Sequence, residues 1–263
     1  MIRISSLFYP KFKYNLIRLG KSFDGGYVVE RRSVMESKTL VSFGISDDWS
    51  FEEDFSNLGD KKIYSYDYSV DRRFWITNFI KSILRILFLK NITENFIKLF
   101  DYFKYKKFFD LKDNFHFKKF ITSSSMKKNL FKSNINISLN ETLKEIDKNI
   151  FLKIDIEGSE YRILDEIIKN SKKINGLVIE FHDFDLHYDL ITRFINNFDQ
   201  NLIHIHVNNY GSINKEGLPS VVELSFASKF FLKDNDFNDK SYPVENLDMP
   251  NNKDEIDYNI TFY

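Results

Sequence analysis

The chain has 263 residues, 38 basic and 38 acidic side chains, a formal net charge of zero and no cysteine. Without cysteine it forms no disulfide and offers neither a thiolate nucleophile nor a cysteine-ligated zinc site. The neutral charge balance gives no reason to expect nucleic acid as a partner. The length suits a single large α/β domain over residues 1–263.

The first predicted elements are a hairpin and a buried strand. Residues 16–29 form two extended pieces around Asp24-Gly25-Gly26, a turn signal because glycine adopts positive φ without steric cost. We expect this hairpin near a sheet edge. An apolar run at residues 39–45 then predicts a buried strand that ends at Gly44.

A helix is expected from Phe51, because Ser50 and Glu53 have the spacing of a capping box. Six further runs predict strands at residues 62–66, 115–121, 151–156, 176–181, 202–207 and 221–226. Most of these runs are separated by helical patterns. Seven strands with intervening helices indicate a doubly wound sheet with helices on both faces.

Two segments fall outside this pattern. Residues 70–114, between the second and third strands, predict a helical insertion that covers the ligand crevice or mediates self-association into a homo-oligomer. Trp75, Phe79, Ile83 and Ile86 lie near one helical face, which we expect to be buried against the domain or a second subunit. Residues 232–263, rich in Asn and Asp, predict a loosely structured tail.

The start of the chain lacks the apolar core of a secretory signal. The most apolar run, residues 74–89, is interrupted by Lys81 and Arg85 and is shorter than the ~20 residues that a spanning helix needs. We therefore expect no transmembrane segment and a cytoplasmic location.

The most informative stretch is residues 151–164, where the period changes from two to about 3.6. A strand passes through Gly158 into a helix for which Ser159 is a plausible N-cap. Asp155 and Glu157 therefore come at the carboxyl end of a strand, which is where ligands bind in open α/β sheets.

Polar residues follow the other strands as well. They are Gly44, Asp67, Asp155, Glu157, His182, Asp183, His206, Asn208 and Asn209. Any one of them could have a purely structural role, as a buried histidine does when its hydrogen bonds are made within the core. As a set on one sheet edge they indicate a site, because buried ionisable groups are costly unless they meet one another or a ligand.

The loop after the first strand argues against a dinucleotide. It has a single glycine, Gly44, followed by Asp47 and Asp48, which would repel a pyrophosphate. S-adenosylmethionine carries positive sulfonium and ammonium groups that suit an acidic loop, and Asp67 is placed to accept hydrogen bonds from ribose hydroxyls. We assign cofactor binding to Phe43, Gly44, Asp67, Tyr68, Thr122 and Asp155.

The sequence also resembles a known family. LKIDIEGSEYRIL looks like the signature of FkbM-like S-adenosylmethionine-dependent methyltransferases. Further blocks of a bacterial branch are resembled by RLGKSFDGGYVV, LVSFGISDDWSFEEDF, VIEFHDF, HIHVNNYG and PSVVELSF. The resemblance implies a seven-stranded class I, Rossmann-like methyltransferase fold. It also implies O-methylation of sugars, since many relatives belong to gene clusters for surface glycans such as capsule or lipopolysaccharide.

A sugar hydroxyl needs a base as the new C–O bond forms. His182 is our first choice, with Asp155 and Glu157 as alternatives and His206 as a weaker one. A Mg²⁺ ion at Asp155 and Asp183 would instead acidify the hydroxyl. Substrate contacts are assigned to Asp183, His206, Asn208 and Asn209, and a nucleotide-sugar diphosphate to Lys118, Lys119, Lys127 and Lys128. An oxidoreductase and a non-catalytic binding protein are the rival classes.

Overall fold

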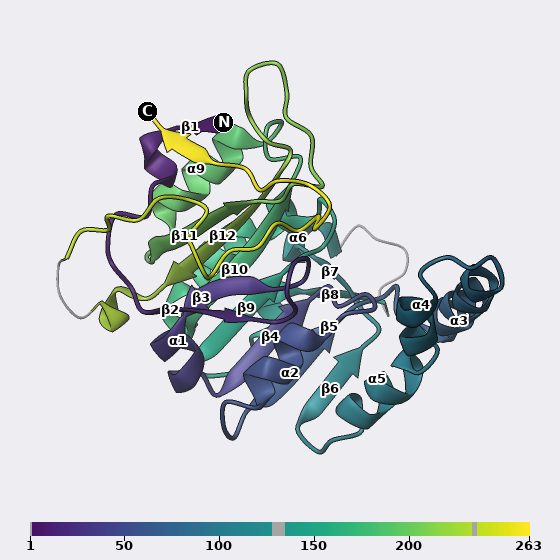
Figure 1. Ribbon diagram of the computed structural model, residues 1–263. Helices are drawn as coiled ribbons and strands as arrows, with labels where there is room; N and C mark the ends of the chain where they lie inside the picture. Colours follow the sequence, from purple (N-terminus) through teal and green to yellow (C-terminus); the bar gives the residue numbers. More distant parts are fainter. Residues whose placement is uncertain (1, 128–134, 233–235) are drawn as a thin grey trace.

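The computed structural model describes residues 2–127, 135–232 and 236–263 (Figure 1). Its centre is a seven-stranded sheet. The strand order is β11 (Asn201–Val207), β12 (Val221–Ala227), β10 (Ile174–His182), β9 (Ile150–Ile154), β4 (Thr39–Phe43), β5 (Lys62–Tyr66) and β6 (Asn114–Phe117). Neighbouring strands are parallel, except that β12 runs antiparallel to both β10 and β11. The predicted fold class is confirmed.

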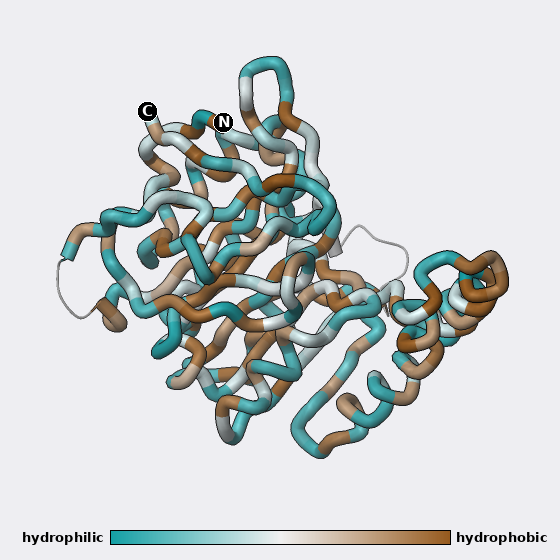
Figure 2. The backbone as a smooth tube through the Cα atoms, in the orientation of Figure 1, coloured by the Kyte–Doolittle hydropathy of each residue, from teal (hydrophilic) through white to brown (hydrophobic). Residues whose placement is uncertain are grey.

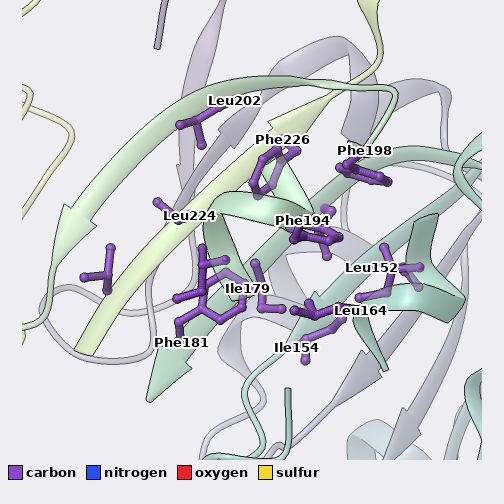
Figure 3. Packing of buried hydrophobic residues seen from close by; sticks show 14 of the residues in the cluster. Leu152, Ile154, Leu164, Ile179, Phe181, Phe194, Phe198, Leu202, Leu224 and Phe226 are labelled. Atoms are coloured by element: carbon purple, nitrogen blue, oxygen red, sulfur yellow. The ribbon is translucent and has the colours of Figure 1, made fainter. Parts of the chain in front are cut away.

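Alternate residues of the central strands face two separate apolar clusters. In β9, Phe151 packs on one side and Leu152 on the other, and in β10 Val178 and Ile179 divide in the same way. The first face is covered by α1 (Arg31–Glu36), α2 (Ser50–Ser56), α5 (Asp101–Phe109) and the hairpin β2 (Leu16–Leu19) and β3 (Tyr27–Glu30). The second is covered by α7 (Leu139–Thr142), α8 (Leu164–Lys169) and α9 (Tyr188–Asn197), and part of its packing is drawn in Figure 3.

Two predicted strands differ in detail from the structure. The hairpin forms, but as a two-stranded sheet of its own that packs on a face rather than at the edge of the large sheet. The predicted strand at residues 115–121 is divided at Lys118 and Lys119. Its second part, β7 (Phe120–Thr122), pairs with β8 (Asn136–Ser138), and the short helix α6 (Ser124–Lys127) follows β7.

Neither predicted N-cap serine makes a capping hydrogen bond with its side chain. Helix α2 begins one residue after Trp49, and no side chain caps it. Ser159 precedes a short 3-10 helix, η2 (Glu160–Arg162), and its side chain makes no capping bond. A complete capping box occurs instead at the start of α7, between Ser138 and Glu141.

Three helices connect β5 to β6: α3 (Arg72–Leu87), α4 (Ile92–Lys98) and α5. Figure 1 shows α3 and α4 beside the body of the protein, and Figure 2 shows that much of this region is apolar. Phe79 and Ile83 are 48% and 37% exposed, so burial of this face against the domain is a wrong prediction. The predicted homo-oligomer remains a proposal.

The C-terminal residues are more ordered than we predicted. Strand β13 (Ile260–Phe262) pairs in parallel with β1 (Ile2–Ile4), which brings the two ends of the chain together. The remaining 3-10 helices are η1 (Ser6–Phe8), η3 (Ser171–Lys173) and η4 (Lys229–Phe231). Among the described residues, no helix has the length and apolar character needed to cross a membrane.

Candidate functional site

The site is built around Gly44, which directly follows β4. Its φ is +83°, and a Cβ atom there would lie 1.7 Å from the carbonyl oxygen of Asp155. Glycine is therefore required, because the chain after β4 passes too close to the end of β9 for any side chain. The buried Lys153 holds the same junction, since its Nζ donates to the Gly44 carbonyl at 2.9 Å and lies 3.4 Å from Glu52.

Asp67 follows β5 and organises the loop after Gly44. Its Oδ2 accepts hydrogen bonds from the backbone N–H groups of Ile45 and Ser46, each at 3.0 Å. Its Oδ1 accepts from the backbone and hydroxyl of Ser69 at 2.8 and 2.6 Å. Burial alone would raise the pKa of Asp67, but these hydrogen bonds outweigh it and lower the pKa. A ribose hydroxyl would have to replace the Ser69 hydroxyl to reach this carboxylate.

A cleft of about 870 Å³ opens at the carboxyl ends of β4, β5 and β9. Four of the predicted cofactor residues line it: Gly44, Asp67, Tyr68 and Asp155. The other two, Phe43 and Thr122, are fully buried and do not line it. The wall also carries acidic residues, namely Asp24, Asp47, Asp48, Glu94, Glu157 and Asp254. These carboxylate acceptors and the volume of the cleft suit a cationic cofactor such as S-adenosylmethionine.

His182, at the end of β10, lies beside this wall with its side chain 18% exposed. Its Nδ1 is 3.1 Å from Oε1 of Glu160, a fully buried carboxylate. A proton on Nδ1 completes this hydrogen bond and leaves Nε2 to accept a proton. Nε2 faces three carboxylates, at 3.4 Å from Glu157, 3.4 Å from Glu180 and 4.0 Å from Asp155.

Glu160 is the functional residue that sequence reasoning missed. Glu160 contacts Nδ1 of His182, while Glu180, which shares its strand, lies 3.4 Å from Nε2. Oε1 of Glu160 also accepts from the backbone N–H groups of Ile156 and Gly158, which fixes it in the turn after β9. The sequence did contain a signal for this role. Glu160 is a carboxylate two residues after Gly158, in a turn whose backbone N–H groups needed an acceptor.

The charges in this cluster shift several pKa values. Burial lowers the pKa of His182, but the hydrogen bond and charge of Glu160, with Asp155 and Glu157, outweigh burial and raise it. Burial raises the pKa of Asp155, although Lys153 and His182 oppose this. Glu180, buried near Asp155, also has its pKa raised, first by burial and then by Asp155 and other acids. His182 does not itself line the cleft but contacts Asp155 and Glu157, which do. A base whose pKa is tuned by neighbouring charges is typical of a catalytic site.

The same atoms form a candidate metal site. Among the described residues, Asp155, Glu157 and His182 each offer one ligand atom within 4.8 Å of the others. Asp183, which we had paired with Asp155, is exposed and absent from this group. An imidazole with two carboxylates suits Mn²⁺ or Zn²⁺ better than Mg²⁺, which prefers oxygen ligands alone.

The predicted substrate contacts are only partly placed near the cleft. His206 is buried between Glu223 and Asp257, with one carboxylate on each ring nitrogen. The Asn209 amide bonds with the backbone of Asn252. These two side chains therefore fasten the C-terminal segment to the sheet rather than line the cleft. The Asn208 amide reaches Glu180 at 3.3 Å, within the His182 cluster.

The lysines that we predicted to bind a diphosphate do not all lie in one place. Lys119 lines the cleft, whereas Lys118 lines a different pocket beside α3 and α5. The side chain of Lys127 and the whole of Lys128 lie outside the described residues.

The strand order and the cleft define a class I, Rossmann-like methyltransferase fold. Residues 118–211 match the family model described as the methyltransferase FkbM domain, which confirms the resemblance noted from the sequence. The matched segment contains Asp155, Glu160 and His182, whereas Gly44 and Asp67 precede it. The match supports S-adenosylmethionine-dependent methylation as the activity.

Several solved structures are similar to the chain at low identity. The precorrin-6y C5,15-methyltransferase of Geobacter metallireducens is 10% identical, with a TM-score of 0.38 and coverage of 75% of this chain and 87% of that chain. An rRNA methylase of Streptococcus thermophilus is 9% identical, with a TM-score of 0.39 and coverage of 75% and 93%. M. jannaschii TYW2 in complex with AdoMet is 10% identical, with a TM-score of 0.33 and coverage of 82% and 88%. No curated protein matches the sequence.

Proposed function

We propose that the protein is an S-adenosylmethionine-dependent O-methyltransferase that acts on a sugar hydroxyl. The acceptor is a nucleotide-activated sugar or a sugar unit of a bacterial surface polysaccharide, such as capsule or lipopolysaccharide. The observation that carries this proposal is the pairing of His182 with the buried Glu160 beside an acidic cleft at the carboxyl ends of the strands. A hydroxyl acceptor requires a base, and this pair supplies one.

The roles of the residues follow from their positions. The cofactor, when bound, supplies an electrophilic methyl group on a sulfonium. Gly44 and the loop after it line the cleft, Asp67 holds that loop, and Asp155 lies where positive charge is favoured. His182 Nε2 accepts the proton of the sugar hydroxyl, and Glu160 stabilises the imidazolium that results.

Two lysines at the cleft bear on the question of a phosphate-bearing acceptor. Lys21 and Lys98 line the cleft and pair with Asp48 and Asp47 at 3.2 and 3.1 Å. Both lysines are about half exposed, so these ion pairs contribute little. A nucleotide-sugar diphosphate would reach the two lysines only after Asp47 and Asp48, which would repel it, turn away.

Methyl transfer from labelled S-adenosylmethionine tests the proposal. The protein is incubated separately with nucleoside-diphosphate sugars, purified surface polysaccharide and RNA, and the label in each acceptor is counted. We expect label on a sugar, with the methyl ether located by NMR. Label on RNA alone would contradict the proposal, and no transfer to any acceptor would favour a non-catalytic binding protein.

A metal-dependent O-methyltransferase is the second candidate, because Asp155, Glu157 and His182 share one ligand centre. In that case the metal would lower the pKa of the acceptor hydroxyl. Loss of activity in EDTA and its return with Mn²⁺, Zn²⁺ or Mg²⁺ would establish this route. Activity that is unchanged in EDTA would exclude it.

A further inference from the structure

The hairpin formed by α3, α4 and the turn between them carries a large exposed apolar surface. We call residues 72–98 the α3–α4 hairpin. Its exposed apolar side chains are Ile76, Phe79, Ile80, Ile83, Leu84, Leu87, Phe88, Leu89, Ile92, Phe96 and Ile97. Leu87, Phe88 and Leu89, at the turn, are 70–78% exposed. A contiguous surface of this kind marks an interaction site.

The hairpin is anchored to the rest of the protein at the opposite end from this turn. The Trp75 ring packs on Tyr105 at 4.9 Å and on Trp49 at 6.3 Å between centroids. Tyr102 of α5 also packs on the Trp75 ring, at 5.8 Å between centroids. The turn with Leu87, Phe88 and Leu89 is therefore presented outward by an element whose base is fixed.

The charge of the hairpin identifies the partner. Its basic residues are Arg72, Arg73, Lys81, Arg85, Lys90 and Lys98, all exposed, and its one acidic residue is Glu94. We propose that this hairpin docks on an anionic lipid surface. Exposed Phe, Leu and Ile next to Lys and Arg are the composition of helices that lie in the membrane interface. Helix α3, with 16 residues and Lys81 and Arg85 within it, fits that orientation.

A second copy of the chain fits this surface less well. In a two-fold dimer the same patch meets itself, and each hairpin has only one acidic residue, Glu94, to offset six basic side chains. Lipid head groups supply the opposite charge. Because Asn91, in the turn, and Glu94 and Lys98 of α4 also line the cleft, docking would hold the cleft close to the lipid surface. The inference does not depend on the acceptor proposed above.

Vesicle flotation tests this inference. The probes are vesicles of phosphatidylcholine alone and of phosphatidylcholine with phosphatidylglycerol. We expect the wild type to float with the anionic vesicles only, and high salt to weaken binding. Phe88→Ser with Leu89→Ser should reduce the partition at least tenfold. Lys81→Glu with Arg85→Glu should reduce it by about fivefold or more at each site.

The matched control is Phe230→Ser with Leu186→Ser. These side chains are 73% and 75% exposed, as against 73% and 78% for Phe88 and Leu89, but they lie outside the hairpin. The control should float like the wild type. The inference fails if the wild type does not bind anionic vesicles, or if the hairpin variants bind as well as the control. It also fails if sedimentation shows a dimer that the hairpin variants lose while vesicle binding is absent.

Discussion

The contact between Glu160 and His182 gives the sharpest prediction about the site. Glu160→Gln keeps the shape of the side chain and removes its charge 3.1 Å from Nδ1. A hydrogen bond between charged groups contributes about 1.5–3 kcal/mol, and 1.36 kcal/mol corresponds to one pKa unit, so the His182 pKa should fall by about 1–2 units. The pKa of His182 is raised in the folded protein, so protonation of His182 stabilises the fold. This stabilisation is complete below about pH 6.5, the ordinary histidine pKa, and is lost as pH rises through the pKa in the folded state.

NMR titration of the histidine ring protons measures this pKa without an acceptor. The chain has five histidines, and the His182 signal is the one missing from His182→Ala. The protein is first dialysed against a chelator so that no metal occupies Nε2. Glu157→Gln is the matched control, since Glu157 lies 3.4 Å from the same ring but is 88% exposed and screened by solvent. The reasoning is refuted if Glu160→Gln leaves the pKa unchanged or if the control shifts it equally.

Three further predictions concern single residues. Asp67→Ala should weaken S-adenosylhomocysteine binding by about tenfold or more in calorimetry, because the loop after Gly44 loses its acceptor; unchanged affinity would remove Asp67 from the site. His182→Ala should lower turnover by roughly 10²–10⁴ with nearly intact cofactor affinity, and equal losses in both would argue for a structural role. Burial lowers the pKa of His206, but hydrogen bonds to Asp257 and Glu223 raise it well above its usual value. His206→Asn should therefore lower the free energy of unfolding most strongly below about pH 6.5, and this loss should shrink as pH rises. A loss that does not depend on pH would refute the ion pairs.

The strands could be predicted because apolar runs report burial directly. The runs at residues 39–45 and 176–181 became β4 and β10, and Asp155 and Glu157 follow β9 as expected. The strand ends also placed Gly44, Asp67 and His182 correctly at one edge of the sheet. Period and turn chemistry are local properties, so a single sequence contains them.

The failures have a different physical origin. Ser50 and Glu53 have the spacing of a capping box, but the capping hydrogen bond depends on the backbone conformation at the start of the helix. No side chain caps α2, and the backbone N–H of Ser50 donates to Asp48 instead. His206 and Asn209 have their partners, Asp257 and Asn252, more than forty positions away in a segment without periodicity. Long-range polar partners leave no local pattern.

Calorimetry with S-adenosylhomocysteine tests the central claim, that the cleft above Gly44 holds the cofactor. The wild type should bind one equivalent and should not bind NAD. Gly44→Ala should weaken binding by about tenfold or more, because its Cβ meets the Asp155 carbonyl at 1.7 Å. Gly217→Ala is the control, since Gly217 has nearly the same φ, +84°, but open space around it, and this variant should bind like the wild type. A wild type that ignores S-adenosylhomocysteine, or that binds NAD instead, would contradict the account.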